Sequence, residues 1–330
     1  MKLEEIKDIF DANGMVLEQT ATYLNNTPCL INKEQMEQIT GGDKTLDQSS
    51  FALFLSNLFF ENQDLASFVY REYYSRGVKK LSPQTYQGDP YYKTIKIPQA
   101  QIGTWTLKNQ TYAPYEAFIF DDLKINGYKE IPQIGFFDTE FTFPTVFENG
   151  VEWMAIKPNE IETMKKPIAD AFGNVLVCGL GLGYYAYMIS NKSSVDSITI
   201  IERDKRVISL FEKYILPQFE NKHKITIVND DAIKYLMEKA PKRAYDFIFV
   251  DLWHDASDGV ELYIRVKKLE TLNKGAEFSY WIERTLISSI RFNIFNALYP
   301  KLKSGEIFKT ENELEQMLSD SYIRELAKHL

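Results

Sequence analysis

The chain has 330 residues, 45% of them hydrophobic, which is enough for a complete α/β domain and a second module. Its 46 acidic residues outnumber its 38 basic ones and give a net charge of −8, which disfavours a nucleic acid as partner. The two cysteines, Cys29 and Cys178, imply no disulfide framework, and the three histidines are too scattered in the sequence to suggest a metal site.

The first 90 residues are predicted to be helical. Apolar residues recur at helical spacing over residues 3–10 and 51–59, and breaks are expected at Asn13-Gly14, at residues 26–28 and at Gly41-Gly42. The chain starts without a signal-peptide core, and its most apolar run, residues 51–60, is too short to cross a bilayer. We therefore expect a cytoplasmic protein that does not enter a membrane.

Residues 91–157 are predicted to form a small antiparallel β module. Short runs of β-branched and aromatic residues alternate there with proline and glycine. The clearest hairpin turns at Asn149-Gly150, because this pair supplies both positive-φ positions of a type I′ turn.

Residues 158–330 are predicted to form an α/β domain with a Rossmann-like doubly wound sheet. A helix starting at Pro158 leads into apolar runs at 174–178, 197–201, 224–228, 245–250 and 277–282, each of which is expected to be a parallel strand. Beyond Arg284 the pattern is mostly helical, and residues 306–309 are the one strand-like run. We thus expect three successive parts, residues 1–90, 91–157 and 158–330.

Three glycines follow the first of these strands. Residues 174–183 read NVLVCGLGLG. Glycine lets the backbone turn sharply and lets a ligand approach it, while the first N–H groups of the next helix point toward that ligand. A nucleotide-like ligand is expected at Gly179, Leu180, Gly181 and Gly183, and the alternative is a glycine-rich strand end without a ligand.

Polar side chains follow the next two strands at the same edge of the sheet, where ligands of open α/β sheets bind. Glu202 comes nineteen positions after Gly183, close to the offset of about twenty at which a carboxylate binds ribose hydroxyls, and Arg203 follows it. Asp230 and Asp231 follow the third strand. An aspartate there caps the next helix, either alone or together with a ligand contact.

The loop after the fourth strand combines two acids, an indole and an imidazole. Histidine titrates near neutrality, so His254 is a candidate base, with Asp251 or Asp255 to orient it. Asp251 and Trp253 are also candidate ligand contacts. The alternative is an exposed loop in which His254 is unengaged and Trp253 packs under the ligand.

These motifs, in this order, resemble the class I S-adenosylmethionine-dependent methyltransferase family. The matching stretches are GLGLG at 179–183, the acid of IIERD at 202, the DA of NDDA at 231–232 and FIFVD at 247–251. The resemblance implies an S-adenosyl-L-methionine cofactor with its amino-acid end on the glycine loop, Glu202 on its ribose hydroxyls and Asp231 on its adenine amino group. It covers residues 170–283.

Two related families differ at specific positions. A nicotinamide-binding domain usually has G-x-G-x-x-G, and here Tyr184 stands at the third glycine position. Spermidine synthase-like aminopropyltransferases resemble the chain more, because they also place a β-rich module ahead of this domain. Their loop carries an aspartate and their fourth strand continues D-x-x-D-P, whereas this chain has Leu180 and Leu182 in the loop and no proline after Asp255. Since a loop acid would repel the cofactor's carboxylate, its absence favours intact S-adenosylmethionine.

The sequence therefore predicts an S-adenosylmethionine-dependent methyltransferase that acts on a small-molecule acceptor, with Asp251, His254 and Asp255 as catalytic residues. Two alternatives stay open, a spermidine synthase-like aminopropyltransferase and a non-catalytic cofactor-binding protein. An open polar pocket beside the transferable group would favour an enzyme, and a pocket filled by side chains would favour the non-catalytic protein. A homodimer is compatible with the sequence.

Overall fold

The computed structural model describes residues 2–307 and 310–330, and within them five parallel strands pair in the order β12-β11-β10-β13-β14. The strands are β10 (Gly173–Cys178), β11 (Val195–Glu202), β12 (Ile225–Asn229), β13 (Phe247–Val250) and β14 (Glu277–Tyr280). The central strands β10 and β13 carry runs of buried apolar residues, as expected for strands covered on both faces. The order reverses between β10 and β13, which is where ligands bind in sheets of this type.

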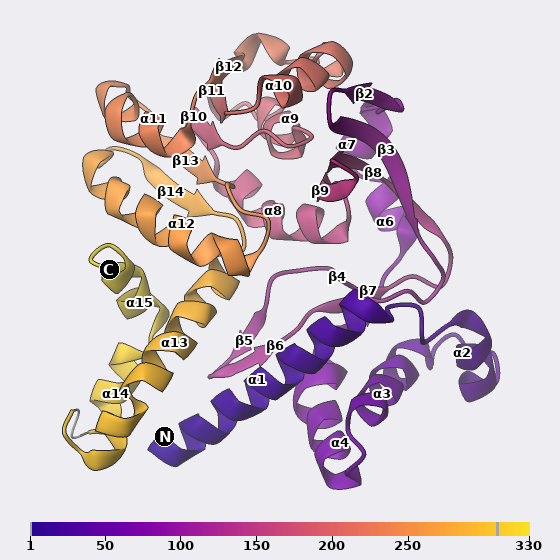
Figure 1. Cartoon of the computed structure of the whole chain (residues 1–330). Helices are drawn as coiled ribbons and strands as arrows, with labels where there is room; N and C mark the ends of the chain where they lie inside the picture. Colours follow the sequence, from indigo (N-terminus) through magenta and orange to yellow (C-terminus); the bar gives the residue numbers. More distant parts are fainter. Residues whose placement is uncertain (1, 308–309) are drawn as a thin grey trace. The chain divides into compact units, whose positions relative to one another are not determined.

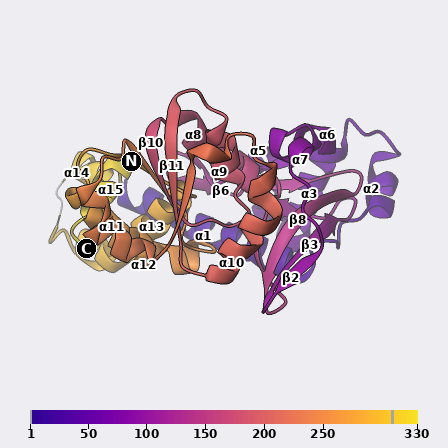
Figure 2. The same cartoon turned by 90° about the horizontal axis from the view of Figure 1, so that it is seen from above.

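Helices cover both faces of this sheet (Figure 1 and Figure 2). On one side lie α8 (Pro158–Asp170), α9 (Tyr184–Ser190) and α10 (Lys205–Leu210), and on the other α11 (Ala232–Glu238) and α12 (Ala256–Leu269). This arrangement is the Rossmann-like doubly wound α/β fold that the sequence predicts. Four further helices are α7 (Pro90–Thr94), α13 (Glu283–Ser304), α14 (Glu311–Met317) and α15 (Asp320–Ala327).

A four-stranded antiparallel sheet is formed by residues that precede α8, and its strand order is β2-β3-β8-β9. The strands are β2 (Ala100–Ile102), β3 (Trp105–Tyr112), β8 (Phe141–Glu148) and β9 (Val151–Ala155). The predicted turn between β8 and β9 is confirmed, because Asn149 and Gly150 have φ of +52° and +82°, as a type I′ turn requires.

The chain divides into two units, each assembled from three stretches. Unit 1 comprises Met1–Thr85, Thr111–Thr142 and Phe292–Gln316, and unit 2 comprises Tyr86–Gln110, Phe143–Arg291 and Met317–Leu330. The parallel sheet, helices α8 to α12 and the β8–β9 turn all lie in unit 2. The expected sequential division at residues 90 and 157 stays a prediction.

Unit 1 contains the N-terminal helices α1 (Leu3–Asn26), α2 (Lys33–Thr40), α3 (Asp47–Phe59), α4 (Gln63–Val69) and α5 (Ser75–Gly77). The break expected at Asn13-Gly14 is wrong, because α1 continues through it. Asn13 is buried, and its side chain donates to the carbonyl oxygen of Tyr128 (2.7 Å) and accepts from the Tyr73 hydroxyl (3.0 Å). Tertiary hydrogen bonds therefore use the side chain that would otherwise compete with the helix. The break at Gly41 is confirmed by its left-handed φ of +62°.

Unit 1 also contains a three-stranded sheet and a hairpin. The sheet has the order β1-β7-β4 with β1 (Val78–Lys80), β4 (Phe118–Ile119) and β7 (Ile134–Phe136), and the hairpin joins β5 (Lys124–Asn126) and β6 (Lys129–Ile131). Helix α6 (Pro83–Gln87) contributes to both units. The strand-like run at residues 306–309 falls in part on Phe308 and Lys309, outside the described residues. Among the residues that are described, no helix has both the length and the apolar character needed to cross a membrane.

Candidate active site

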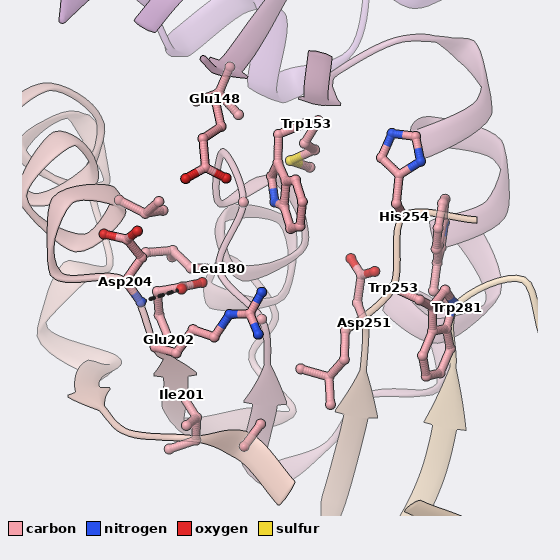
Figure 3. A pocket seen from close by; sticks show the side chains of 18 of the residues that line it. Glu148, Trp153, Leu180, Ile201, Glu202, Asp204, Asp251, Trp253, His254 and Trp281 are labelled. Atoms are coloured by element: carbon pink, nitrogen blue, oxygen red, sulfur yellow. Dashed lines mark hydrogen bonds between the residues drawn. The ribbon is translucent and has the colours of Figure 1, made fainter. Parts of the chain in front are cut away.

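A pocket of about 350 Å³ lies in unit 2 at the carboxyl ends of the parallel strands. Figure 3 shows Glu202 and Asp251 at the ends of strands on one side, with Glu148 and Trp153 of the β8–β9 hairpin on the opposite side. Most of the side chains predicted to act at the site line this pocket, namely Gly179, Leu180, Gly181, Glu202, Arg203, Asp230, Asp231, Asp251, Trp253 and His254. Gly183 and Asp255 are not among the residues that line it.

Backbone geometry makes glycine necessary in the loop after β10. Gly179, Gly181 and Gly183 have φ of +103°, +52° and +74°, a region that glycine adopts without strain. A Cβ on Gly179 would overlap the carbonyl oxygen of Asp251, so the loop and the end of β13 are in close main-chain contact. A Cβ on Gly183 would overlap the Phe211 ring, so this glycine serves packing.

Met154 on β9 covers the middle of the glycine loop. The Leu182 N–H donates to its Sδ (3.0 Å), and a Cβ on Gly181 would overlap the same sulfur. The neighbouring N–H groups of Gly179 and Gly183 donate to the carbonyl oxygens of Ile201 (3.0 Å) and Leu180 (2.9 Å). Three N–H groups of the loop therefore already have acceptors within the chain.

Glu202 ends β11 and its carboxylate lies at the pocket wall. Burial raises its pKa, while the backbone N–H groups of Asp204, Leu180 and Arg203 act in the opposite direction. The Asp204 N–H donates to Oε1 at 2.8 Å, the contact drawn in Figure 3. Backbone donors thus fix the orientation of a carboxylate that faces the pocket.

The acids after β12 have partners of their own. Asp231 is the N-cap of α11 and accepts from the Lys234 N–H at 2.8 Å. Asp230 lies 2.6 Å from Lys239 Nζ, and this hydrogen bond lowers its pKa. Asp231 therefore caps the helix and also lines the pocket, and its contact with a ligand stays a prediction.

Two carboxyl groups at the β10–β13 end of the pocket are held in an unfavourable environment. Burial raises the pKa of Asp251, at the end of β13, to about 7. Glu160, in the first turn of α8, is almost completely buried, and burial followed by the charge of Asp251 raises its pKa well above the usual range. A positive charge placed between these groups would restore their ionised forms.

In the rest of the loop after β13, Asp255 caps a helix, whereas Trp253 and His254 line the pocket. Asp255 is the N-cap of α12, where it accepts from the Ser257 N–H (2.7 Å), and that bond contributes to its lowered pKa. His254 is exposed, with its Nδ1 3.5 Å from Asp255 Oδ2 and its ring 6.3 Å from the Trp153 ring. Trp253 is buried, and its Nε1–H has no acceptor among the described residues.

The lining of the pocket is strongly acidic and aromatic. Among the described residues that line it, eight are acidic and two, Lys157 and Arg203, are basic. The acids are Glu148, Glu152, Glu160, Glu202, Asp204, Asp230, Asp231 and Asp251. All four tryptophans of the chain line the same pocket. Arg206 and Lys239, outside the lining, pair with Asp204 and Asp230, and the other acids still outnumber the two basic residues of the lining. Such a site suits a ligand that carries positive charge.

Sequence reasoning missed the residues that come from the hairpins and from α8. These are Trp105, Glu148, Glu152, Trp153, Met154, Lys157, Glu160 and, from the segment after β14, Trp281. No spacing rule connects them with the strand ends. The one signal available was the density of Glu and Trp beside the Asn149-Gly150 turn, directly ahead of α8.

The strand order and the glycine loop define the class of the protein, an α/β protein with the methyltransferase-like Rossmann fold. Comparison with known proteins gives a family match for part of the chain. Residues 160–267 match the family described as spermine/spermidine synthase domain. The polyamine aminopropyltransferase of Clostridium botulinum (strain Eklund 17B / Type B) is 30% identical over 95 residues, which cover 28% of this chain and 32% of the relative. The match thus spans about a third of that relative's length.

Solved structures give low overall similarity. A spermidine synthase in complex with the transition state analogue AdoDATO has a TM-score of 0.32 at 17% identity, covering 45% of this chain and 54% of that one. The spermidine synthase from Thermotoga maritima has a TM-score of 0.31 at 17% identity, covering 45% and 55%.

The prediction of an S-adenosylmethionine-dependent methyltransferase, with S-adenosylmethionine as its cofactor, is wrong, because both sequence matches are to aminopropyltransferases. The prediction relied on the absence of an acid at Leu180 and Leu182. The pocket nevertheless contains carboxylates from outside the loop, among them Glu160 on α8 and Glu152 on β9.

Proposed function

We propose that this chain is an aminopropyltransferase, which moves a 3-aminopropyl group from decarboxylated S-adenosylmethionine to a small primary amine. The match to the spermine/spermidine synthase domain supports it, as does the similarity to a polyamine aminopropyltransferase. The observation that carries the proposal is the charge of the pocket, eight acidic side chains against two basic ones.

The charge of the substrates explains why this observation matters. The donor carries a sulfonium and an ammonium group, and the acceptor carries at least one more ammonium. Acidic clefts concentrate cations and orient them, and tryptophan faces attract ammonium groups. A pocket of about 350 Å³ is also open, which favours an enzyme over a non-catalytic protein whose site is filled by side chains.

The order of the strands suggests how the donor lies. With Glu202 on the ribose hydroxyls and Asp231 toward the adenine, the nucleoside occupies the β11–β12 end of the pocket. The sulfur and its aminopropyl chain then extend over β10 toward β13, where Asp251 and Glu160 lie. Arg203, next to Glu202, stays at the nucleoside end.

The reaction is a displacement at carbon. The lone pair of the acceptor nitrogen forms a bond to the methylene carbon beside the sulfonium, the carbon–sulfur bond breaks, and its electron pair leaves with sulfur as a neutral thioether. The attacking nitrogen is an ammonium group in solution, so it first loses one proton to a base, which frees its lone pair. Asp251 is the proposed base, because it lines the pocket at the end of β13, beside the proposed position of the aminopropyl chain, and can accept a proton once it is ionised.

Positioning supplies the rest of the rate enhancement, because the nitrogen must be held in line with the breaking bond in a site that excludes water. His254 and Trp153 are exposed side chains that line the pocket, and we place the entry of the acceptor beside them. Asp255, as the cap of α12, is proposed to hold the loop rather than to contact substrate.

The test is an assay of the purified chain with decarboxylated S-adenosylmethionine and a panel of diamines, with 1,4-diaminobutane and 1,3-diaminopropane as first probes. We expect equal amounts of methylthioadenosine and an amine heavier by one aminopropyl group, detected by mass spectrometry. S-adenosylmethionine as donor is the matched control and should give no alkylated amine. Absence of any aminopropylated product with either probe, from a protein that binds the donor, would disprove the proposal.

A further inference from the structure

The glycine loop itself carries no group that would choose the decarboxylated donor. Leu180 and Leu182 are apolar and buried, and the acids of the pocket come from other elements. The inference below rests on the proposed function and concerns how the same site selects its donor. The two donors differ only in one carboxylate, which is attached to the carbon that bears the ammonium group.

Met154 engages one of the backbone donors that a carboxylate above the loop would need, and carbonyl oxygens engage two more. An anion at a loop of this kind is normally held by free N–H groups. Here the Leu182 N–H donates to Met154 Sδ at 3.0 Å, and those of Gly179 and Gly183 donate to carbonyl oxygens. A carboxylate above the loop would lose water and gain few hydrogen bonds, which is costly for a charged group.

Glu160 makes the same region unfavourable for a negative charge. Its carboxyl group is buried at the pocket wall and interacts with the charges of Asp251 and Glu152. The nearby cation Lys157 lowers the pKa of Glu160 and so offsets these charges in part, but its Nζ also lies 2.6 Å from Glu152 Oε1, and the pKa of Glu160 stays well above its usual range. The other basic residue of the pocket, Arg203, belongs to the nucleoside end beside Glu202.

We propose that Glu160, together with Met154 over the glycine loop, selects the donor that ends in a lone ammonium group and rejects the one that also bears a carboxylate. The ammonium group lies between Glu160 and Asp251 and stabilises their ionised forms. Binding of the decarboxylated donor is therefore accompanied by release of protons, since both carboxyl groups have raised pKa values before the ligand arrives.

The test compares three nucleosides by isothermal titration calorimetry: decarboxylated S-adenosylmethionine, S-adenosylmethionine, and methylthioadenosine, which lacks the charged chain. Titrations in two buffers of different ionisation enthalpy report the number of protons released. For the native chain we expect tighter binding of the decarboxylated donor and proton release with that donor. In Glu160→Gln the preference over S-adenosylmethionine should fall by about tenfold, with less proton release and unchanged affinity for methylthioadenosine.

Glu162→Gln is the matched control on the same helix. Its carboxylate accepts from the Tyr86 hydroxyl (3.1 Å) and pairs with Lys165, and it is not among the residues that line the pocket. It should keep both the preference and the proton release. An unchanged preference in Glu160→Gln would overturn the proposal, as would a native chain that binds the two donors equally.

Met154→Ala carries the test if Glu160→Gln fails to fold. Freeing the Leu182 N–H should raise affinity for S-adenosylmethionine by about threefold or more and leave methylthioadenosine unaffected. No gain for S-adenosylmethionine would count against the proposal. The proposed function is tested separately by the product assay. If discrimination between the donors depends on Glu160 but no aminopropylated product forms, the selection is upheld and the aminopropyltransferase activity is rejected.

Discussion

The acids at the two ends of the pocket have different partners. At the β11–β12 end, Asp230 is paired with Lys239, and Glu202 receives backbone N–H groups that oppose the effect of its burial. At the β10–β13 end, burial raises the pKa values of Asp251 and Glu160, and no neighbouring cation compensates fully. In the proposed function, the first end binds the neutral hydroxyl and amino groups of the nucleoside, and the second becomes favourable when the ammonium group of the donor enters.

The largest effect is expected from Asp251→Asn, which keeps the shape of the side chain and removes the base. Aminopropyl transfer should slow by about 100- to 10,000-fold, while affinity for methylthioadenosine changes little. The native rate at low substrate concentration should rise with pH through about 7, as Asp251 loses its proton, and this limb should vanish in the variant. A variant with the native rate and pH profile would remove the base from this end of the pocket.

Glu202→Gln tests the nucleoside end. Loss of a charge-assisted hydrogen bond to the ribose costs about 1.5–3 kcal/mol, so affinity for methylthioadenosine should fall by about 10- to 100-fold. Calorimetry measures it, and Asp196→Asn, an exposed residue near the start of the same strand, is the control. Equal affinity in the variant and the control would place the nucleoside elsewhere.

Gly181→Ala tests the packing of Met154 against the glycine loop. A positive φ and overlap with Met154 should together lower the free energy of unfolding by about 1–3 kcal/mol. Urea unfolding of Gly181→Ala, Met154→Ala and the double variant forms a double-mutant cycle, in which the two changes should partly cancel. Gly275→Ala, where no atom lies within 4 Å of a new Cβ, is the control. Strict additivity would show that the two residues do not interact.

The stability of the ligand-free chain should depend on pH because of Asp251. Its carboxyl group has a pKa of 3.8 in the usual state and about 7 in the folded chain, so between these values the folded state binds more protons than the unfolded state. The contribution of Asp251 to stability therefore falls as pH rises from about 4 to about 7. Across this pH range, the unfolding temperature should fall less with rising pH for Asp251→Asn than for the native chain. An identical pH dependence in both proteins would contradict the assignment.

The smallest effects belong to the loop after β13. Asp255→Ala should lower the free energy of unfolding by about 1 kcal/mol, through loss of the cap on α12, and leave turnover within about threefold. His254→Ala, at an exposed position, should change turnover by a similarly small factor. Steady-state kinetics and urea unfolding separate the two effects. A hundredfold loss of turnover in either variant would return these residues to the catalytic group that the sequence predicts.

The acids at the β11–β12 end of the pocket could be predicted from sequence because they follow strands directly. Apolar runs fix the ends of β11 and β12, and Glu202 and Asp231 come immediately after them. Parallel strands then bring these ends to one edge of the sheet whatever else the chain does. The turn at Asn149-Gly150 could also be predicted, because two adjacent residues determine its geometry.

Glu160 and Met154 could not be predicted in this way. Glu160 lies in a helix whose apolar face is all that periodicity reveals, and its contact with the charge of Asp251 joins residues far apart in the sequence. Met154 reaches the loop only because the β8–β9 hairpin packs over it. The absence of a loop acid therefore misled the choice of donor. Residue types within a motif do not report what other elements bring to it.

The four tryptophans, Trp105, Trp153, Trp253 and Trp281, have an optical consequence. Because all of them line one pocket in unit 2 and none lies in unit 1, the tryptophan fluorescence of the intact chain reports on that pocket alone. Emission should respond to a ligand there without any attached dye. Unit 1, rich in phenylalanine and tyrosine, is dark at wavelengths that excite only indole, so unfolding of the two units can be followed separately by comparing fluorescence with circular dichroism.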